Sequence, residues 1–559
     1  MTLKELTDQV SGKGRGPLFA ALLALIAGLP GILALPPVDR DESRFAEASA
    51  QMLESGDFTT IMFQDVPRFK KPVGIYWLQA LSVKLLSGVE RREIWAYRIP
   101  SLLGAMLAAG ACAWGAAAFL RPGLATMAGA LMASTAMLST ESNLAATDAA
   151  LCGATTLAMA ALARLYFAAR EGPPAGWRVK ALFWLGVSAS VLLKGPIGPM
   201  VVALTILGLV AWERRARWLT TLGWDWGLIL FFGITLPWAL AITVTTDGAF
   251  WGMAVGGDLA PKLMSGQEGH GSPPGYYALL SPWLAFPASL LLPAGLVAGW
   301  RLRAEPGVRF ALCWLIPSAI VFELVPTKLP HYVLPLYGAL AWLMAAALGH
   351  PLGRFARWGG VGLEALAAIV FVGLVGYGVW LYGDVASWIW LTLAGVLLAA
   401  TAVAGALLLL RRRAGLATAA VIGLGVLAHD ALAGGLAPTL KPLWLSDQVA
   451  RALAKAKISP RQGLAPSPVA VAGFPEPSMV FALGATTQLG DAGDAAKAIV
   501  QGRPAVVEGR QQPAFQADLA AAHAGASLVA TVSGLDYSTG KPQILRVYAP
   551  LPAAPKPGG

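Results

Sequence analysis

The sequence predicts a polytopic α-helical membrane protein that ends in a small α/β domain. Its 559 residues are 56% hydrophobic and 13% charged, with a mean hydropathy of +0.61, whereas soluble domains carry about 25% charged residues. This composition excludes a soluble globular enzyme and a disordered scaffold. The apolar segments run continuously instead of alternating with polar residues, which excludes an outer-membrane β-barrel.

About 13 apolar segments approach the length of about 20 residues that a membrane-spanning helix needs. The shortest of them flank Arg121 and Lys194. The expected helices cover residues 16–36, 98–120, 123–140, 147–168, 180–193, 195–212, 221–245, 277–300, 309–325, 331–348, 359–383, 387–410 and 415–436. With the long loops at 37–97 and 246–276, they form a predicted transmembrane domain over residues 1–438.

The basic residues predict which side of the membrane each loop faces, because Lys and Arg gather in short cytoplasmic loops. When Lys4, Lys13 and Arg15 are placed in the cytoplasm, every short loop on that side is basic. These loops carry Arg121, Arg170, Arg178, Lys180, Arg214, Arg215, Arg217, Arg301, Arg303, Arg354, Arg357, Arg411, Arg412 and Arg413. Membrane topology thus explains the net charge of +11, and no nucleic-acid partner is expected.

The opposite, outer side carries both long loops and the C-terminal tail. Long loops of mixed charge usually have a function. Residues 439–559 are predicted to form a soluble α/β domain, because strands at 468–473, 505–508, 527–533 and 543–548 alternate with helices at 494–500 and 515–523. The tail sequence has no phosphate-loop or metal motif, which favours an accessory role.

The first outer loop begins with an acidic cluster directly after the first membrane helix. Asp41 and Glu42 lead into residues 42–52, whose apolar side chains recur at helical spacing and predict a short amphipathic helix on the membrane surface. Asp41 could cap the N-terminus of this helix. A carboxylate at the mouth of a membrane cavity can instead act as a general base or bind a cation.

A basic and aromatic segment follows in the same loop. Lys70 and Lys71 precede Tyr76 and Trp77, a combination that suits an anionic headgroup at the membrane interface. The alternative is an interfacial anchor, in which the lysines reach toward water while the rings lie among the headgroups.

Further charges lie at the outer ends of later helices and in the second long loop. Asp148 either faces an aqueous cavity or caps its helix, and Lys194 is either a helix terminator or a phosphate ligand. Asp258 and His270 could bind a metal ion, although the spacing matches no standard metal motif. The same loop contributes Lys262 and Glu268, and the remaining substrate-binding candidates are Lys328, His331 and Tyr332.

All of these charges fall on the outer side under a topology derived without them. Two carboxylates and several cations around one outward cavity would suit a phosphate-bearing lipid substrate and a nucleophile. Because these acidic and basic residues lie on the same side of the membrane, we expect them to have a functional role together.

The order of the motifs is similar to that of a known family. The chain carries, in sequence, Asp41-Glu42-Ser-Arg-Phe-Ala-Glu47, Glu54-Ser-Gly-Asp57, Lys71-Pro72 before Tyr76-Trp77, Leu-Leu-Lys194-Gly195, Leu236-Pro237-Trp238 and Lys328-Leu-Pro-His331-Tyr332. These motifs resemble the bacterial aminoarabinose lipid A transferases. That family lies within the polyprenyl-phosphate-dependent membrane glycosyltransferases of the GT-C type, which include protein O-mannosyltransferases. The resemblance covers residues 1 to about 350.

The resemblance implies an inverting glycosyltransferase of the bacterial inner membrane whose site and C-terminus face the periplasm. It would move a sugar from undecaprenyl or another polyprenyl phosphate to lipid A, lipopolysaccharide or another envelope acceptor. Asp41 maps to the acid of the catalytic loop, with Glu42 beside it, Asp148 to a second acid and Lys71 to a lysine near the donor phosphate. No cofactor is required, and a divalent cation is possible.

Two departures from the family pattern bear on the substrate. Lys70 stands where the family carries a glutamate that is a metal-site candidate, and Gly257-Asp258 replaces a Glu-His pair. Galacturonic acid or a hexose is therefore as compatible as aminoarabinose. The alternatives are sugar transfer to protein, a flippase or transporter of lipid-linked sugars, and a membrane scaffold whose tail binds a partner.

Overall fold

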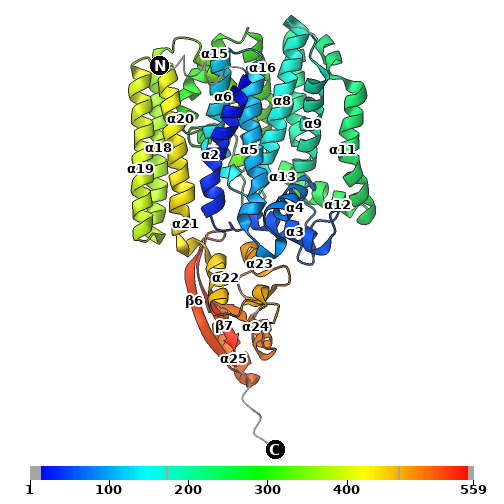
Figure 1. Cartoon of the computed structure of the whole chain (residues 1–559), viewed down its shortest axis with the longest axis vertical. Coiled ribbons are helices and arrows are strands. Elements are labelled where there is room, and N and C mark those ends of the chain that lie inside the picture. The colour runs from blue at the N-terminus through cyan, green and yellow to red at the C-terminus, as the bar shows by residue number, and fades with distance from the viewer. Residues whose placement is uncertain (1–13, 172–173, 268, 464–465, 552–559) are drawn as a thin grey trace, which may run out of the picture.

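The protein is a polytopic helical membrane protein with a small C-terminal sheet domain, as the sequence predicts. The computed structural model describes residues 14–171, 174–267, 269–463 and 466–551, so Lys4, Lys13 and Glu268 lie outside the described residues. Long helices run side by side, and the sheet domain lies beyond one end of them (Figure 1). The short helices of the first long loop lie at that same end.

Eight helices in the described part of the chain are long and apolar enough to span a membrane. Their continuous apolar sequence favours helix, because every backbone N–H and C=O in lipid must be paired within the segment. They are α2 (Gly16–Ala34), α5 (Ile94–Ala116), α8 (Asp148–Glu171), α11 (Trp224–Thr245), α16 (Pro306–Leu324), α18 (Arg354–Tyr382), α19 (Val385–Leu410) and α20 (Ala414–Asp430). The last span continues through η7 (Ala431–Leu436) and α21 (Ala437–Thr439).

Two of the expected spans are bent. α6 (Pro122–Ser134) meets α7 (Ala136–Ser142) at 61°, and α14 (Tyr276–Leu284) meets η5 (Ala288–Leu291) and α15 (Leu292–Arg301) at 117°. The other expected ranges hold the shorter or more basic helices α9 (Trp177–Lys194), α10 (Ile197–Glu213) and α17 (Tyr337–Ala347). Helix therefore occupies every expected range, while the described residues contain eight helices long and apolar enough to span a membrane, or up to ten if each bent pair is one span.

The first outer loop folds into α3 (Asp41–Ser55), a hairpin of β1 (Met62–Phe63) and β2 (Val66–Pro67), and α4 (Gly74–Leu86). The prediction that α3 lies on the membrane surface is wrong. Phe45 packs among bundle residues, and Ala46 and Ala50 pack with Phe481 of the C-terminal domain, so both faces are buried. Asp41 is also not the N-cap, because it is the first helical residue and no side chain caps the helix.

The second outer loop and the connections contain short helical turns. The loop comprises α12 (Ala249–Trp251), the π-helical turn η4 (Gly252–Leu259) and α13 (Ala260–Met264). Short 3₁₀ turns lie at Val89–Arg91, Arg217–Leu222, Pro330–Leu336, Lys441–Leu443, Pro460–Gln462 and Gly509–Gln511.

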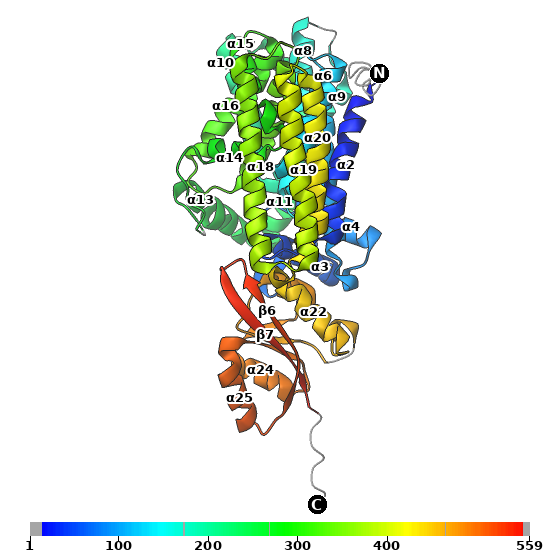
Figure 2. The same ribbon diagram turned by 90° about the vertical axis from the view of Figure 1, so that its left-hand side faces the viewer.

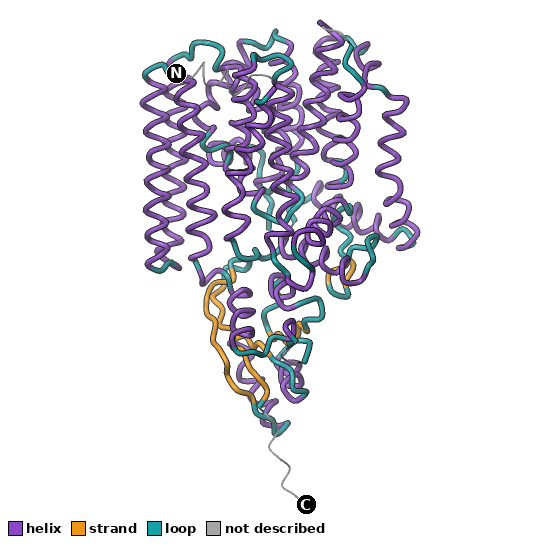
Figure 3. Tube along the Cα trace, in the orientation of Figure 1, coloured by secondary structure: helices purple, strands orange, loops and turns teal. Residues whose placement is uncertain are grey.

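The C-terminal domain is a five-stranded mixed sheet with the order β4-β3-β5-β7-β6. Its long strands, orange in Figure 3, lie beyond the ends of the helices. β3 (Ala470–Ala472) pairs in parallel with β4 (Gln488–Gly490) and β5 (Ala505–Glu508). β7 (Lys541–Pro550) runs antiparallel to β5 and to β6 (Ala526–Asp536). α22 (Leu445–Lys455) and α23 (Pro477–Leu483) cover one face, and α24 (Ala492–Val500) and α25 (Gln512–Ala521) cover the other. The four predicted strands and two predicted helices are present, and α22, α23 and β4 are additional.

Candidate active site

A charged cleft lies where both long loops meet the outer ends of the helices. Ten residues singled out from the sequence line it: Asp41, Lys70, Lys71, Asp148, Lys194, Asp258, Lys262, His270, His331 and Tyr332. The lining is completed by Arg44, Phe45, Arg68, Thr147, Gln267, Thr327 and Leu329. Its free volume is about 60 Å³, so the cleft must widen to admit a sugar phosphate.

Asp148 contacts two basic side chains from different elements, a lysine and a histidine. α8 presents it while packing closely on α5, where a Cβ on Gly153 would lie 2.5 Å from the carbonyl oxygen of Gly104. Lys194, the last residue of α9, donates a hydrogen bond to Asp148. His331 Nε2 lies 3.8 Å from the second carboxylate oxygen. Asp148 thus fixes the positions of a lysine and a histidine that come from opposite halves of the chain.

Glu141 is a second buried carboxylate beside the cleft, and the sequence analysis did not single it out. Its Oε1 lies 3.4 Å from His331 Nδ1, so the imidazole stands between two carboxylates, which orient the ring. A carboxylate at the end of a long apolar run is costly unless it is paired. That cost was the available signal, but the expected helix ended at residue 140, which left Glu141 in a turn.

Asp41 is the most open of the carboxylates that line the cleft. Its side chain is 64% exposed, and the nearest guanidinium nitrogens of Arg44 and Arg68 lie 3.8 and 3.7 Å away. Arg68 is held in place over the ring of Phe45, 5.0 Å from the centroid. These cations orient Asp41 and leave the carboxylate open to the cleft, where it can accept a proton from a substrate hydroxyl.

Lys71 and Lys262 meet at Asp258. Lys71 Nζ lies 3.4 Å and Lys262 Nζ 2.7 Å from the two oxygens of Asp258. Burial, together with the nearby charge of Lys194, lowers the pKa of Lys71 to about 8 although Asp258 opposes the shift. Burial tends to raise the pKa of Asp258, but the two lysines outweigh it and hold this pKa below its usual range.

The candidate metal ligands do not form a metal site. Asp258 is occupied by two lysines, and over the described ranges no group of three or more His, Cys, Asp or Glu side chains is arranged to hold a metal ion. His270 lines the cleft instead as part of a loop whose carbonyl accepts the Lys328 N–H at 2.9 Å. The donor set at Asp258 therefore does not fit a divalent cation.

Glu42 and Tyr76 lie outside the cleft lining. Nε and Nη2 of Arg98 each lie 2.8 Å from a carboxylate oxygen of Glu42, which also accepts the Ala145 N–H at 2.7 Å. Tyr76 is buried against Phe45, with the ring centroids 5.4 Å apart. Both side chains are buried next to the cleft and stabilise the segments that form it. Neither side chain faces the cleft.

Lys328 also lies behind the cleft. Its Nζ donates hydrogen bonds to the carbonyl oxygens of Ser272, at 2.8 Å, and Val325, at 2.7 Å. Together with the contact of its N–H to the His270 carbonyl, these bonds tie two segments of the rim. Lys328 therefore shapes the cleft through the loop that carries His270.

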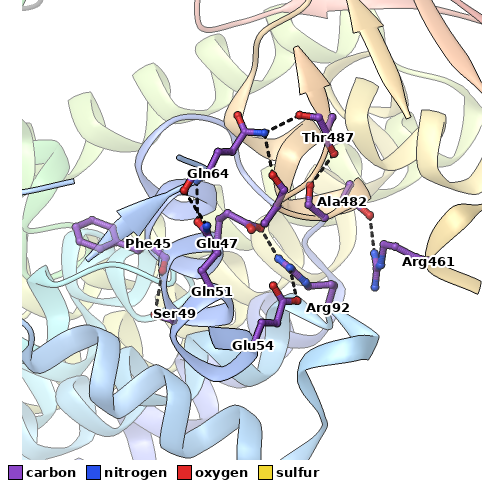
Figure 4. Close-up of polar contacts among 12 residues, drawn as sticks. Phe45, Glu47, Ser49, Gln51, Glu54, Gln64, Arg92, Arg461, Ala482 and Thr487 are labelled. Carbon is purple, nitrogen blue, oxygen red and sulfur yellow. Dashed lines mark hydrogen bonds and ion pairs between the residues drawn. The ribbon is translucent and has the colours of Figure 1, made fainter. Parts of the chain in front are cut away.

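The C-terminal domain holds the far side of the first outer loop (Figure 4). Gln64, in the turn of the β1–β2 hairpin, donates from Nε2 to the carbonyl oxygens of Ala485, at 3.0 Å, and Thr487, at 2.6 Å. Arg92 binds two glutamates of α3 on the same side. The helix that begins with Asp41 is thus held by the bundle on one side and by the sheet domain on the other.

The family match covers the first outer loop and the helices that follow it. Residues 34–251, which include Asp41, Lys71 and Asp148, match the family described as dolichyl-phosphate-mannose-protein mannosyltransferase. An undecaprenyl phosphate-alpha-4-amino-4-deoxy-L-arabinose arabinosyl transferase of Yersinia pestis is 29% identical over 340 residues, which are 58% of this chain and 58% of that protein. The enzyme of the same name from Yersinia enterocolitica is 28% identical over 60% of this chain and 59% of that protein. The chain thus matches less than two thirds of the length of these curated relatives.

The likeness in fold extends over nearly the whole chain. The crystal structure of ArnT from Cupriavidus metallidurans bound to undecaprenyl phosphate matches with a TM-score of 0.75 and 19% identity, over 95% of this chain and 97% of that one. The chain has the ArnT fold. The match includes the sheet domain, which the sequence motifs did not reach. An oligosaccharyltransferase of Archaeoglobus fulgidus matches the ArnT-like fold more distantly, with a TM-score of 0.51 and 12% identity over 97% of this chain and 75% of that one. The resemblance inferred from the motifs is therefore confirmed.

Proposed function

We propose that this protein is an inverting glycosyltransferase that moves a sugar from undecaprenyl phosphate, or a related polyprenyl phosphate, to lipid A. The observation that carries the proposal is the cleft in which Asp41, Lys71 and Asp148 come together beside the membrane helices. The names of the curated relatives favour a pentose, 4-amino-4-deoxy-L-arabinose, as the sugar.

The chemistry of the cleft suits transfer from a lipid phosphate. An acceptor oxygen attacks the anomeric carbon from the face opposite to the phosphate, and the bond from that carbon to the phosphate oxygen breaks. The bonding electron pair leaves with the polyprenyl phosphate, whose growing negative charge Lys71, Lys70 and Lys194 are placed to stabilise. Asp41 takes the proton of the attacking hydroxyl, while Asp148 keeps Lys194 in position.

An apolar groove of about 570 Å³ adjoins the cleft and suits the polyprenyl chain. It lies among α14, α16 and α17, and its lining includes Tyr277, Leu315 and Tyr337. Val333, two residues beyond His331, connects the groove to the cleft along the chain. Because each buried CH₂ group stabilises binding by about 0.8 kcal/mol, such a groove can hold the lipid while its phosphate reaches the cations.

The charge distribution supports a cleft that faces the periplasm of the inner membrane. The arginine-rich loops lie at the opposite end of the helices, and such loops are typical of the cytoplasmic side. Residues 1–438 then form the transmembrane domain, and residues 439–559 form an accessory domain in the periplasm.

The test uses the purified protein in liposomes with undecaprenyl-phosphate-linked aminoarabinose and lipid A, and follows the mass of lipid A. We expect Asp41→Asn to lower turnover at least about 100-fold, the usual contribution of a positioned base, without loss of thermal stability. Asp65→Asn removes an exposed carboxylate from the same loop and should leave turnover unchanged. Wild-type turnover in Asp41→Asn would exclude Asp41 as the base.

The same assay separates the alternatives. Transfer to protein is the second candidate, because residues 34–251 match a family named for protein mannosylation, and it predicts a mass gain on a protein acceptor while lipid A stays unmodified. A flippase would move labelled donor across the vesicle without modifying any acceptor. Donors that carry galacturonic acid or a hexose, offered in parallel, identify the sugar.

A further inference from the structure

A second charged cavity lies at the end of the bundle opposite to the cleft. Its volume is about 700 Å³, and it is built where α18, α19 and α20 end or begin side by side (Figure 2). Arg357 comes from the first turns of α18, Arg412 and Arg413 from the connection between α19 and α20, and His350 from the segment before α18. The described lining contains no Asp or Glu, so this cavity is strongly cationic.

Two features direct this positive charge into the cavity. The Nε of Arg357 is buried and has no hydrogen-bond partner among the described residues, and its Nη1 makes a long contact of 3.4 Å with the Leu410 carbonyl. In addition, α20 begins at Ala414, and its first residues, Ala414, Gly415 and Leu416, line the cavity. The N–H groups of a first helical turn lack intrahelical acceptors, and the helix dipole there favours an anion.

Leucines supply the rest of the wall. Leu348, Leu352, Leu409 and Leu416 line the cavity beside the arginines. A neighbouring cavity of about 310 Å³ shares His350 and Leu352 and adds Arg301. A cationic rim above an apolar wall, at the end of membrane helices, complements a phosphate headgroup and the first carbons of its acyl chains. A free inorganic anion would gain nothing from the leucines.

We propose that this cavity binds the headgroup of an anionic phospholipid, such as phosphatidylglycerol or cardiolipin, from the leaflet at this end of the helices. Basic pockets between membrane helices are known to bind such headgroups on the cytoplasmic side. The site is separate from the cleft, and its occupancy does not depend on sugar transfer. The competing explanation is that these are ordinary basic residues of cytoplasmic loops, in which case any arginines at this end would serve equally.

The experiment compares two triple variants with equal loss of charge. Delipidated protein in neutral detergent is titrated with phosphatidylglycerol, cardiolipin, phosphatidylcholine or inorganic phosphate, and binding is followed by native mass spectrometry and thermal shift. We expect Arg357→Gln/Arg412→Gln/Arg413→Gln to weaken anionic-lipid binding at least about tenfold. The control Arg214→Gln/Arg215→Gln/Arg217→Gln removes three exposed arginines outside this cavity and should change binding less than about twofold.

Three outcomes would overturn the proposal: equal losses in the two triple variants, equal binding of phosphatidylcholine, or complete displacement of the lipid by millimolar phosphate. If the first triple variant does not fold, Arg412→Gln alone serves, because its side chain is exposed. We expect that single variant to lose about fivefold in anionic-lipid affinity, and an unchanged affinity would likewise contradict the assignment.

Discussion

Asp41 and Glu42 are adjacent in the sequence but lie in opposite environments. The side chain of Asp41 is 64% exposed in the cleft, whereas that of Glu42 is 2% exposed and bound by Arg98. Successive side chains of an α-helix point about 100° apart, so one residue of this pair faces the cleft and its neighbour faces the bundle. These environments support the chemical role proposed for Asp41 and indicate a structural role for Glu42.

Lys71 leads to a prediction about pH. Burial, with Lys194 nearby, lowers its pKa to about 8, and only the protonated ammonium can stabilise a leaving phosphate. As the pH rises through about 8 the side chain loses its charge, so kcat/KM for the donor should fall, approaching about tenfold per pH unit. In Lys71→Arg the guanidinium stays charged, so this fall should be absent from its pH profile. A fall that persists in Lys71→Arg would assign the titration to another group.

At the scale of elements, Arg98 joins three helices, α2, α3 and α5. It belongs to α5 and is fully buried, and it binds Glu42 of α3. Its Nη1 also donates to the carbonyl oxygens of Ile32, at 3.2 Å, and Leu35, at 2.6 Å, at the end of α2. The start of α3, and with it Asp41, is positioned by this one guanidinium.

The prediction at this scale is a loss of stability when Arg98 is removed. Arg98→Met leaves the Glu42 carboxylate buried without its cation, which should lower the free energy of unfolding by about 3–5 kcal/mol. Arg98→Met/Glu42→Leu removes both charges and should recover part of this loss. Thermal unfolding in detergent measures both, with the exposed Arg91→Met as the control. Equal stability of the single and double variants would show that the unpaired carboxylate does not cause the loss.

At the scale of the whole molecule, the sheet domain contacts the chain immediately before Asp41. The Asp39 N–H donates to the Tyr537 hydroxyl at 2.6 Å, and Arg40 Nη2 donates to the Ser538 carbonyl at 3.1 Å. Arg40 adopts a φ of +66°, a region that residues other than glycine rarely occupy. The turn between β6 and β7 thus helps to hold the unusual backbone that starts α3.

The acidic groups at this contact predict that domain docking weakens as pH rises. Burial raises the pKa of Asp39 to about 6 and that of Glu476 to about 7, from usual values of 3.8 and 4.5. Asp536 adds to both shifts, and Arg40 opposes them. Because both folded-state pKa values are raised, the stabilisation is complete below about pH 4 and is lost as pH rises through 6 to 7.

Hydrogen exchange measures this effect. After correction for intrinsic rates, residues 36–44 should exchange faster at pH 8 than at pH 5, and Glu476→Gln should reduce the difference. A difference that is unchanged in Glu476→Gln would exclude this carboxyl as the titrating group.

Sequence reasoning reached much of the cleft and missed parts of it for identifiable reasons. His331 and Lys328 lie three residues apart and were grouped as substrate ligands, yet His331 lines the cleft while Lys328 bonds backbone carbonyls behind it. Arg68 belongs to the same basic cluster as Lys70 and Lys71 but was not named as a substrate ligand, because its place depends on stacking over Phe45. The surface position expected for α3 was wrong because a helix buried against a second domain has the same one-sided pattern as a helix on a membrane.

The sequence by itself determined the membrane class, the positions of the helices, the strands of the tail and the end at which the charges of the cleft gather. These properties follow from the length and period of apolar runs and from the distribution of Lys and Arg, which are local along the chain. Only the tertiary structure decided which charges face the cleft, which carboxylates are held by arginines, and that the sheet domain supports α3. Those features depend on which helix ends meet and on which way each side chain points. Both are determined by contacts between residues more than a hundred positions apart in the sequence.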